Sequence, residues 1–283
     1  MKRGLLILIF CGVFLLNGCA AARTAFSADP REIDLPIAMY HSVLPEASRA
    51  GEYVVTPEVI ERDLRELMRR GYETVTFCDV LAFVEEGADL PAHPVMITFD
   101  DGHTNVMRYV LPILEELDQR AVMFVVGSYA EWFSGREDCG ADYAYLNWQQ
   151  LTELSETGRF EIQAHSYAMH ELSPRKGTGK MPGESEEAYR AAFCTDTELL
   201  LHALRENCGI LPTAFAYPFG IAEKSTTEYL RMLGIRASVT CYECRNTVRR
   251  GEPEDLYFLG RHNRPASLST DAFLRKLLNE KNG

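Results

Sequence analysis

The chain has 283 residues, of which 46% are hydrophobic and 25% charged, and its formal net charge is −12. The length fits one large domain or two small ones, and the apolar content is sufficient for a sizeable core. The negative charge argues against a nucleic-acid partner and against electrostatic binding to acidic lipids or polymers.

The N-terminal residues have the pattern of a secretory signal. Two basic residues precede an apolar stretch at 5–16 that is too short for a stable membrane span. We therefore predict a signal peptide over residues 1–18, which places the mature protein outside the cytoplasm.

The signal ends in Leu16-Asn17-Gly18-Cys19, which resembles a bacterial lipobox. In such a sequence the cysteine is lipidated and becomes N-terminal after cleavage. This predicts an exported lipoprotein that is anchored through Cys19 and a tether at 19–34, on the extracellular face of a bacterial membrane or in the cell envelope. Ordinary cleavage near Ala20–Ala22, without a lipid, is the alternative.

From Leu35 onward, apolar runs alternate with helical patterns. Strands are predicted at 36–43, 72–77, 94–99, 121–126, 160–164, 213–217 and 236–240, with a further short strand at 257–259. Helices are predicted at 58–70, 79–86, 103–117, 145–155, 186–207, 225–233 and 271–278. This alternation predicts a parallel α/β sheet or barrel, and no internal repeat or linker divides residues 35–283.

Six cysteines follow Cys19, and an exported protein can form disulfides. Their pairing cannot be deduced from spacing. The pair Cys241 and Cys244 has the spacing of a redox or zinc motif, but no second such pair accompanies it, so a disulfide or two free thiols is favoured over a metal knuckle. The other four are Cys78, Cys139, Cys194 and Cys208.

The central stretch of the sequence is 94–102, which reads P-V-M-I-T-F-D-D-G. Its β-branched, apolar residues predict a buried strand that ends in Asp100 and Asp101, just before a helix. Sites of α/β proteins form at such strand ends. Two adjacent carboxylates repel each other unless a cation or a proton relieves them. A turn that caps the helix is the simpler interpretation of this stretch taken alone.

A second predicted strand, at 160–164, runs directly into His165, and His170 follows five residues later. On a straight helix these two side chains would point about 140° apart, but at a strand end that turns into a loop they can converge. Together with Asp101 they would supply the three protein ligands of a catalytic metal site.

Three motifs in order, T-F-D-D-G, H-S-x-x-x-H and F-A-Y-P-F-G, resemble the polysaccharide deacetylase family (NodB-homology domain, carbohydrate esterase family four). The resemblance covers roughly residues 35 to 265. The first two motifs together are specific, whereas Y-P-F-G alone is weak. The spacing of the histidines and an early M-Y-H are similar to the branch that deacetylates poly-N-acetylglucosamine. The resemblance implies a distorted (β/α) barrel with fewer than eight strands.

The resemblance also implies a role for each matching residue. Asp101, His165 and His170 match a metal triad that usually holds zinc, and Asp100 matches the general base. Tyr217 matches the position whose backbone N–H helps to hold the oxyanion. These roles are chemically coherent, because a metal polarises an acetyl carbonyl while a carboxylate takes a proton from water.

The late part of the sequence departs from the family pattern. The segment Leu259-Gly-Arg-His-Asn263 matches the usual late histidine motif poorly, and an arginine-rich third motif is missing. In the branch with the early M-Y-H the motifs are circularly permuted, so His41 is predicted as the general acid, with His262 in reserve. Arg261 is a candidate to orient Asp100. A buried structural histidine is the alternative for His41.

These residues predict a metal-dependent hydrolase that removes N-acetyl groups from N-acetylglucosamine units of an extracellular or cell-wall polysaccharide. Its partners would be the N-acetylated glycan polymer and, through the lipid, the membrane. The motifs leave open peptidoglycan or an O-acetylated xylan as substrate, since the metal centre attacks any acetyl carbonyl delivered to it. A glycan-binding lipoprotein without turnover and a purely structural lipoprotein are the non-enzymatic alternatives.

Overall fold

The computed structural model describes residues 31–136 and 142–280, so the predicted signal peptide, Cys19 and Cys139 lie outside the described residues. Strand β1 (Glu32–Asp34) pairs antiparallel with β11 (Thr247–Arg249). The folded unit therefore begins before the expected Leu35, because residues assigned to the tether have strand partners more than 200 positions away.

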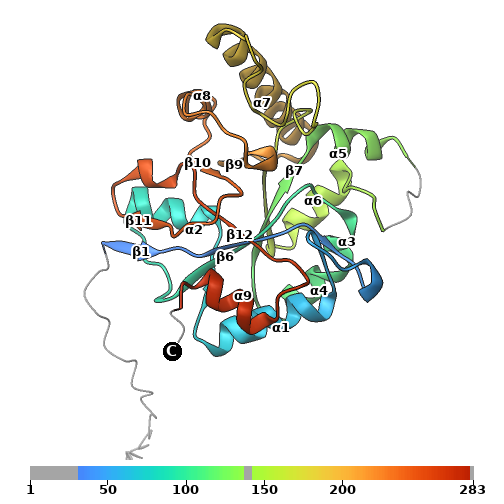
Figure 1. Ribbon diagram of the computed structural model, residues 1–283, viewed down its shortest axis with the longest axis vertical. Coiled ribbons are helices and arrows are strands. Elements are labelled where there is room, and N and C mark those ends of the chain that lie inside the picture. The colour runs from blue at the N-terminus through green and yellow to red at the C-terminus, as the bar shows by residue number, and fades with distance from the viewer. Residues whose placement is uncertain (1–30, 137–141, 281–283) are drawn as a thin grey trace, which may run out of the picture. The chain divides into compact units, whose positions relative to one another are not determined.

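A parallel sheet forms the centre of the fold (Figure 1). Its strands follow the order β10-β9-β8-β7-β6-β2-β12, with the two-residue β5 paired beside β6. The strands are β2 (Ile37–Tyr40), β5 (Glu73–Thr74), β6 (Pro94–Phe99), β7 (Ala121–Val125), β8 (Phe160–Ala164), β9 (Ala214–Ala216), β10 (Ala237–Val239) and β12 (His262–Asn263). A separate parallel pair joins β3 (Ser42–Val43) to β4 (Val54–Val55).

One short segment, residues 259–263, joins the two edges of this sheet. Leu259 forms a parallel bridge with Val239 of β10, and β12 then pairs in parallel with β2. The sheet thus closes into a distorted barrel with seven strands along its path, which confirms the predicted fold class. The strand predicted at 257–259 is wrong, because Phe258 has φ +58° and breaks the extended backbone.

Helices surround the strands (Figure 1). One predicted helix is divided into α3 (Thr104–Tyr109) and α4 (Leu111–Leu117), since Pro112 lacks the N–H that a continuous helix would use. Helix α5 (Gly127–Ser134) is additional, because its short sequence lacks a clear apolar period. The others are α1 (Pro57–Arg69), α2 (Phe77–Leu81), α6 (Trp148–Glu156), α7 (Glu186–Cys208), α8 (Thr226–Met232) and α9 (Thr270–Leu277). Four shorter helical turns lie at Ala47–Arg49, Ala82–Glu86, Pro218–Gly220 and Pro253–Leu256.

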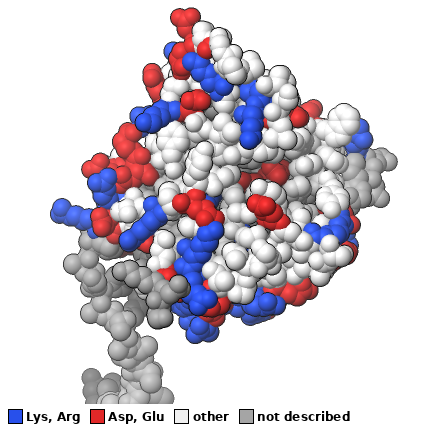
Figure 2. Space-filling view, viewed as in Figure 1, with Lys and Arg blue, Asp and Glu red and all other residues white. Residues whose placement is uncertain are grey.

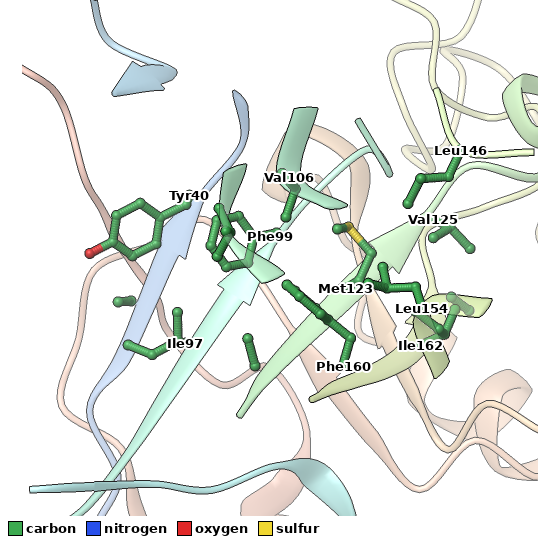
Figure 3. Close-up of a cluster of buried hydrophobic side chains, with 14 of the residues drawn as sticks. Tyr40, Ile97, Phe99, Val106, Met123, Val125, Leu146, Leu154, Phe160 and Ile162 are labelled. Carbon is green, nitrogen blue, oxygen red and sulfur yellow. The ribbon is translucent and has the colours of Figure 1, made fainter. Parts of the chain in front are cut away.

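Both faces of the central strands are buried, as expected for a parallel sheet covered on both sides. On β6, Ile97 and Phe99 belong to the larger apolar cluster, part of which Figure 3 shows, whereas Met96 packs with Val122 and Phe124 in a second cluster. Side chains alternate along a strand, so Asp100 follows Met96 onto the second face. The strand thereby delivers a carboxylate to the end of the barrel.

The surface and the cysteines complete the description of the fold. On the face shown in Figure 2, acidic and basic side chains are interspersed. Within residues 31–136 and 142–280, no helix is long and apolar enough to cross a bilayer. The five described cysteines are free thiols, so Cys241 and Cys244 do not form a disulfide in this structure.

Candidate metal and catalytic site

The carboxyl ends of β6 and β8 bring the three predicted metal ligands together. The ligand atoms of Asp101, His165 and His170 all lie within 4.8 Å of one another. Oδ1 of Asp101 is 3.1 Å from Nε2 of His170 and 3.6 Å from Nε2 of His165. This oxygen is buried and accepts no hydrogen bond of regular geometry from the described residues. A buried, unsatisfied carboxylate oxygen that faces two imidazole nitrogens fits a divalent cation.

Outer contacts fix the orientation of both histidine rings. Nδ1–H of His165 donates to the carbonyl of Ala216 at 2.7 Å, so the lone pair of this ring is on Nε2, toward Asp101. The Tyr129 hydroxyl lies 3.4 Å from Nδ1 of His170. The two rings are therefore held with the same nitrogen, Nε2, directed to the cluster.

The two histidines differ in basicity. Burial lowers the pKa of His165 to about 4, so this ring is neutral at pH 7. Burial also disfavours the charged form of His170, but the contact with the Asp101 carboxylate outweighs it and raises the pKa of His170. Proton binding at this cluster is therefore concentrated on His170.

The loop between the two histidines is held by Asp196 of α7, which the motifs do not single out. Its Oδ1 accepts from the N–H of Tyr167 at 2.8 Å and its Oδ2 from the N–H of Ala168 at 2.7 Å. The sequence contains a signal for this residue: Asp196 lies at helical spacing between Phe193 and Leu200, on the buried face of the helix. A lone carboxylate on an apolar helix face needs hydrogen-bond donors from elsewhere.

The predicted contact between Arg261 and Asp100 is present as a two-pronged ion pair. Nη1 and Nη2 of Arg261 donate to Oδ1 and Oδ2 of Asp100 at 2.6 and 2.7 Å. The guanidinium also donates to the Thr240 carbonyl at 3.0 Å, and both members of the pair are buried. Burial alone would raise the pKa of Asp100, but the Arg261 charge keeps it below its ordinary value. Asp100 is therefore an anion at neutral pH.

The two candidate acids lie in different surroundings. His41 directly follows β2, and the charges of Asp100 and Asp101 act on its ring, although burial lowers its pKa. Its Nδ1 is buried and has no hydrogen-bond partner among the residues described. His262, by contrast, follows Arg261 on an extended segment and so points to the opposite face. Its charged neighbours are Glu243 and Lys276, and its Nδ1 is likewise buried without a hydrogen-bond partner among the described residues. The reserve role of His262 therefore stays a prediction.

The backbone N–H of Tyr217 donates to the carbonyl of Val239 at 3.1 Å, as part of the ladder between β9 and β10. The expectation that this amide holds an oxyanion is therefore corrected, because the sheet already uses it. Phe219, two residues further on, has φ +58°, and its ring centroid is 4.8 Å from that of His170. The turn that carries Phe219 is thus the part of this motif that lies beside the metal ligands.

The match to a known family agrees with this geometry. Residues 87–238 match the polysaccharide deacetylase family, more than half of the chain. The chain therefore belongs to this family of hydrolases, as its motifs indicate.

Two relatives and one solved structure show which members of this family the chain resembles. The chain is 24% identical over 260 residues to poly-β-1,6-N-acetyl-D-glucosamine N-deacetylase of Escherichia coli (strain K12), covering 81% of this chain and 38% of that protein. It is 22% identical over 208 residues to the protein of the same name from Staphylococcus epidermidis, covering 74% and 68%. The structure of IcaB from Ammonifex degensii superposes with a TM-score of 0.68 at 25% identity, over 87% of this chain and 96% of that one. The chain thus spans well under half the length of the E. coli relative.

Proposed function

We propose that the protein is a metal-dependent N-deacetylase of an extracellular polymer of the poly-N-acetylglucosamine type. One observation carries this proposal: the ion-paired Asp100 adjoins Asp101, whose unsatisfied oxygen faces the Nε2 atoms of two histidines. A metal site with a carboxylate base beside it suits amide hydrolysis. The names of the two curated relatives support N-acetylglucosamine as the sugar.

We propose zinc as the metal. Two imidazole nitrogens and one carboxylate oxygen are ligands that zinc takes in catalytic sites with three protein ligands. Bound there, the cation would polarise the acetyl carbonyl and lower the pKa of water. Asp101, His165 and His170 would hold it.

The remaining steps fall to the side chains around the cluster. Asp100 takes a proton from the water whose oxygen adds to the acetyl carbon. His41 gives a proton to the nitrogen as the C–N bond breaks, so the products are acetate and a free amine. Asp100 and Asp101 favour the charged form of His41 that this step needs, but burial outweighs them and lowers the pKa of His41. Because the Tyr217 amide is used by the sheet, we assign the oxyanion donor to the Phe219 amide.

Acetate release from β-1,6-linked N-acetylglucosamine oligomers tests the proposal, with zinc-loaded and chelated protein side by side. Asp100→Asn should lower the rate by at least about 10²-fold, the usual contribution of a general base. Asp118→Asn changes an exposed aspartate in the same way and should leave the rate unchanged. Zinc-loaded wild type that releases no acetate from these oligomers, but does so from peptidoglycan or acetylated xylan, would reassign the substrate. Full activity in Asp100→Asn would reject the enzyme mechanism.

We further propose that the protein is exported and anchored through a lipid on Cys19. The basic, apolar and lipobox-like residues of the first 19 positions support this. Expression in a bacterium with labelled palmitate tests it. Wild type should carry the label and sediment with membranes, and Cys19→Ser should do neither. Equal labelling of the two proteins would reject the anchor.

A further inference from the structure

Asp101 divides its two carboxylate oxygens between different partners. Oδ1 faces His165 and His170, as described above, whereas Oδ2 lies 3.5 Å from Nε2 of His103. His103 therefore contacts Oδ2, the Asp101 oxygen that does not face the two histidine ligands.

His103 is itself held by an aromatic stack that leads to a second ligand. Its ring lies against Tyr145, with centroids 4.8 Å apart and planes 24° apart. The other neighbour of Tyr145 is Tyr129, with a centroid distance of 4.3 Å. The Tyr129 hydroxyl then reaches Nδ1 of His170. His103, Tyr145 and Tyr129 thus form a chain of contacts from Asp101 to His170 that does not pass through the metal cluster.

The backbone supports the same arrangement. His103 and Tyr145 form an antiparallel bridge, and the N–H of Thr104 donates to the Ala144 carbonyl at 2.9 Å. On the other side, the N–H of Leu146 donates to the Gly102 carbonyl at 2.8 Å. The segment that carries Tyr145 is therefore paired with the segment that follows Asp101, and this pairing places the two rings side by side.

We propose that His103, Tyr145 and Tyr129 form an outer bracket that positions Asp101 and His170 and thereby sets the affinity of the metal site. The three are positioning residues, since they reach the metal only through its ligands. This inference rests on the metal site of the proposed function, but it concerns binding and not turnover.

The physical reason is that a ligand must be held in one orientation for its full affinity to be realised. A carboxylate with one oxygen engaged by His103 presents the other oxygen to the cation. Without that contact, the Asp101 side chain can rotate in the metal-free protein. Metal binding then carries the entropic cost of fixing it in one orientation. Removing the outer partner of a metal ligand typically weakens affinity 10- to 100-fold.

The test measures zinc affinity directly, by competition with a chromophoric chelator and without substrate. His103→Ala should weaken zinc binding by about 10- to 100-fold. His103→Gln keeps a side-chain N–H donor and should recover most of that loss. Tyr145→Phe keeps the ring and should bind zinc like wild type, whereas Tyr145→Ala should weaken binding. His202→Ala removes an exposed histidine of α7 and should leave the affinity unchanged.

The outcomes separate this inference from the proposed function. Zinc affinity of His103→Ala within twofold of wild type would overturn the bracket, and so would an equal loss in His202→Ala. If His103→Ala fails to fold by circular dichroism, the comparison of Tyr145→Phe with Tyr145→Ala decides the question. Wild type that binds zinc tightly and releases no acetate would overturn the proposed function, while the affinity series would still support or reject the bracket.

Discussion

Arg261 donates hydrogen bonds to both carboxylate oxygens of Asp100, at 2.6 and 2.7 Å, although the two residues lie 161 positions apart in the chain. Arg261 belongs to the segment 259–263 that joins the edges of the sheet. The same few residues therefore close the barrel and orient the proposed base. Correct closure of the fold is thus a condition for a correctly placed Asp100.

Replacing Arg261 with methionine should destabilise the protein by about 3–5 kcal/mol at pH 7, because Asp100 would remain buried without its partner. The pKa of Asp100 is lowered in the folded protein, so its favourable contribution is present above the unfolded pKa and is lost as the pH falls through the folded pKa. The difference between wild type and variant should therefore shrink below about pH 4. Urea unfolding at pH 7 and at pH 3.5 measures both values.

Arg69→Met provides the control, since Arg69 makes a pair with Glu66 on the exposed surface of α1. This change should leave the free energy of unfolding nearly the same at either pH. If Arg261→Met lowers the free energy of unfolding equally at pH 7 and at pH 3.5, the Asp100 charge is not the cause of the loss.

The sequence predicts the parts of the structure that local patterns determine. The strand at 160–164 and the helix from Glu186 are found where expected, because continuous apolar runs and helical periods depend on neighbouring residues. The convergence of Asp101 with His165 and His170 is also predicted, since carboxyl ends of parallel strands meet at one edge.

The remaining features depend on pairing between distant segments, which no local pattern reveals. β12 has only two residues, and it is a strand because β2 lies beside it. The Tyr217 amide is occupied because β10 forms alongside β9. A motif gives the identity of a residue, but the sheet decides which of its groups are free.

Asp196→Ala should weaken zinc binding by about tenfold or more, because two backbone N–H groups of the loop between His165 and His170 lose their acceptor. Asp196→Asn keeps one acceptor oxygen, so its zinc affinity should lie between those of Asp196→Ala and wild type. The measurement is the same chelator competition. Glu198→Ala, at an exposed position of the same helix, is the matched control and should bind zinc normally. Wild-type affinity in Asp196→Ala would show that the loop holds its shape without this carboxylate.

Zinc affinity should fall as the pH drops through the neutral range, because His170 must lose a proton to bind a metal and its pKa is raised. His165 should contribute nothing to this dependence above about pH 5, since its pKa is lowered to about 4. Titrations between pH 5 and 8 should therefore show the loss of affinity for a single proton, with a midpoint above the ordinary histidine value near 6.5. A two-proton dependence, or a midpoint below about 6.5, would contradict the assignment of the titrating proton to His170.

A second buried ion pair connects α1 to the C-terminal part of the chain. Asp63 accepts from Nε of Arg264 at 2.6 Å, from Tyr40 at 3.0 Å and from Thr270 at 2.5 Å. Asp63→Ala leaves the Arg264 charge buried and unpaired, so we expect a loss of about 3–5 kcal/mol in the free energy of unfolding.

Urea unfolding of Asp63→Ala at pH 7 checks this value, with Glu61→Ala as the control. Glu61 lies on the same helix, and its pair with Arg65 is largely exposed, so its removal should change stability little. Asp63 accepts hydrogen bonds from Tyr40, Arg264 and Thr270 and contacts none of the three metal ligands, so the zinc affinity of the folded Asp63→Ala protein should equal that of wild type. If Asp63→Ala and Glu61→Ala lower the free energy of unfolding equally, burial does not make the loss of the Asp63–Arg264 pair more costly.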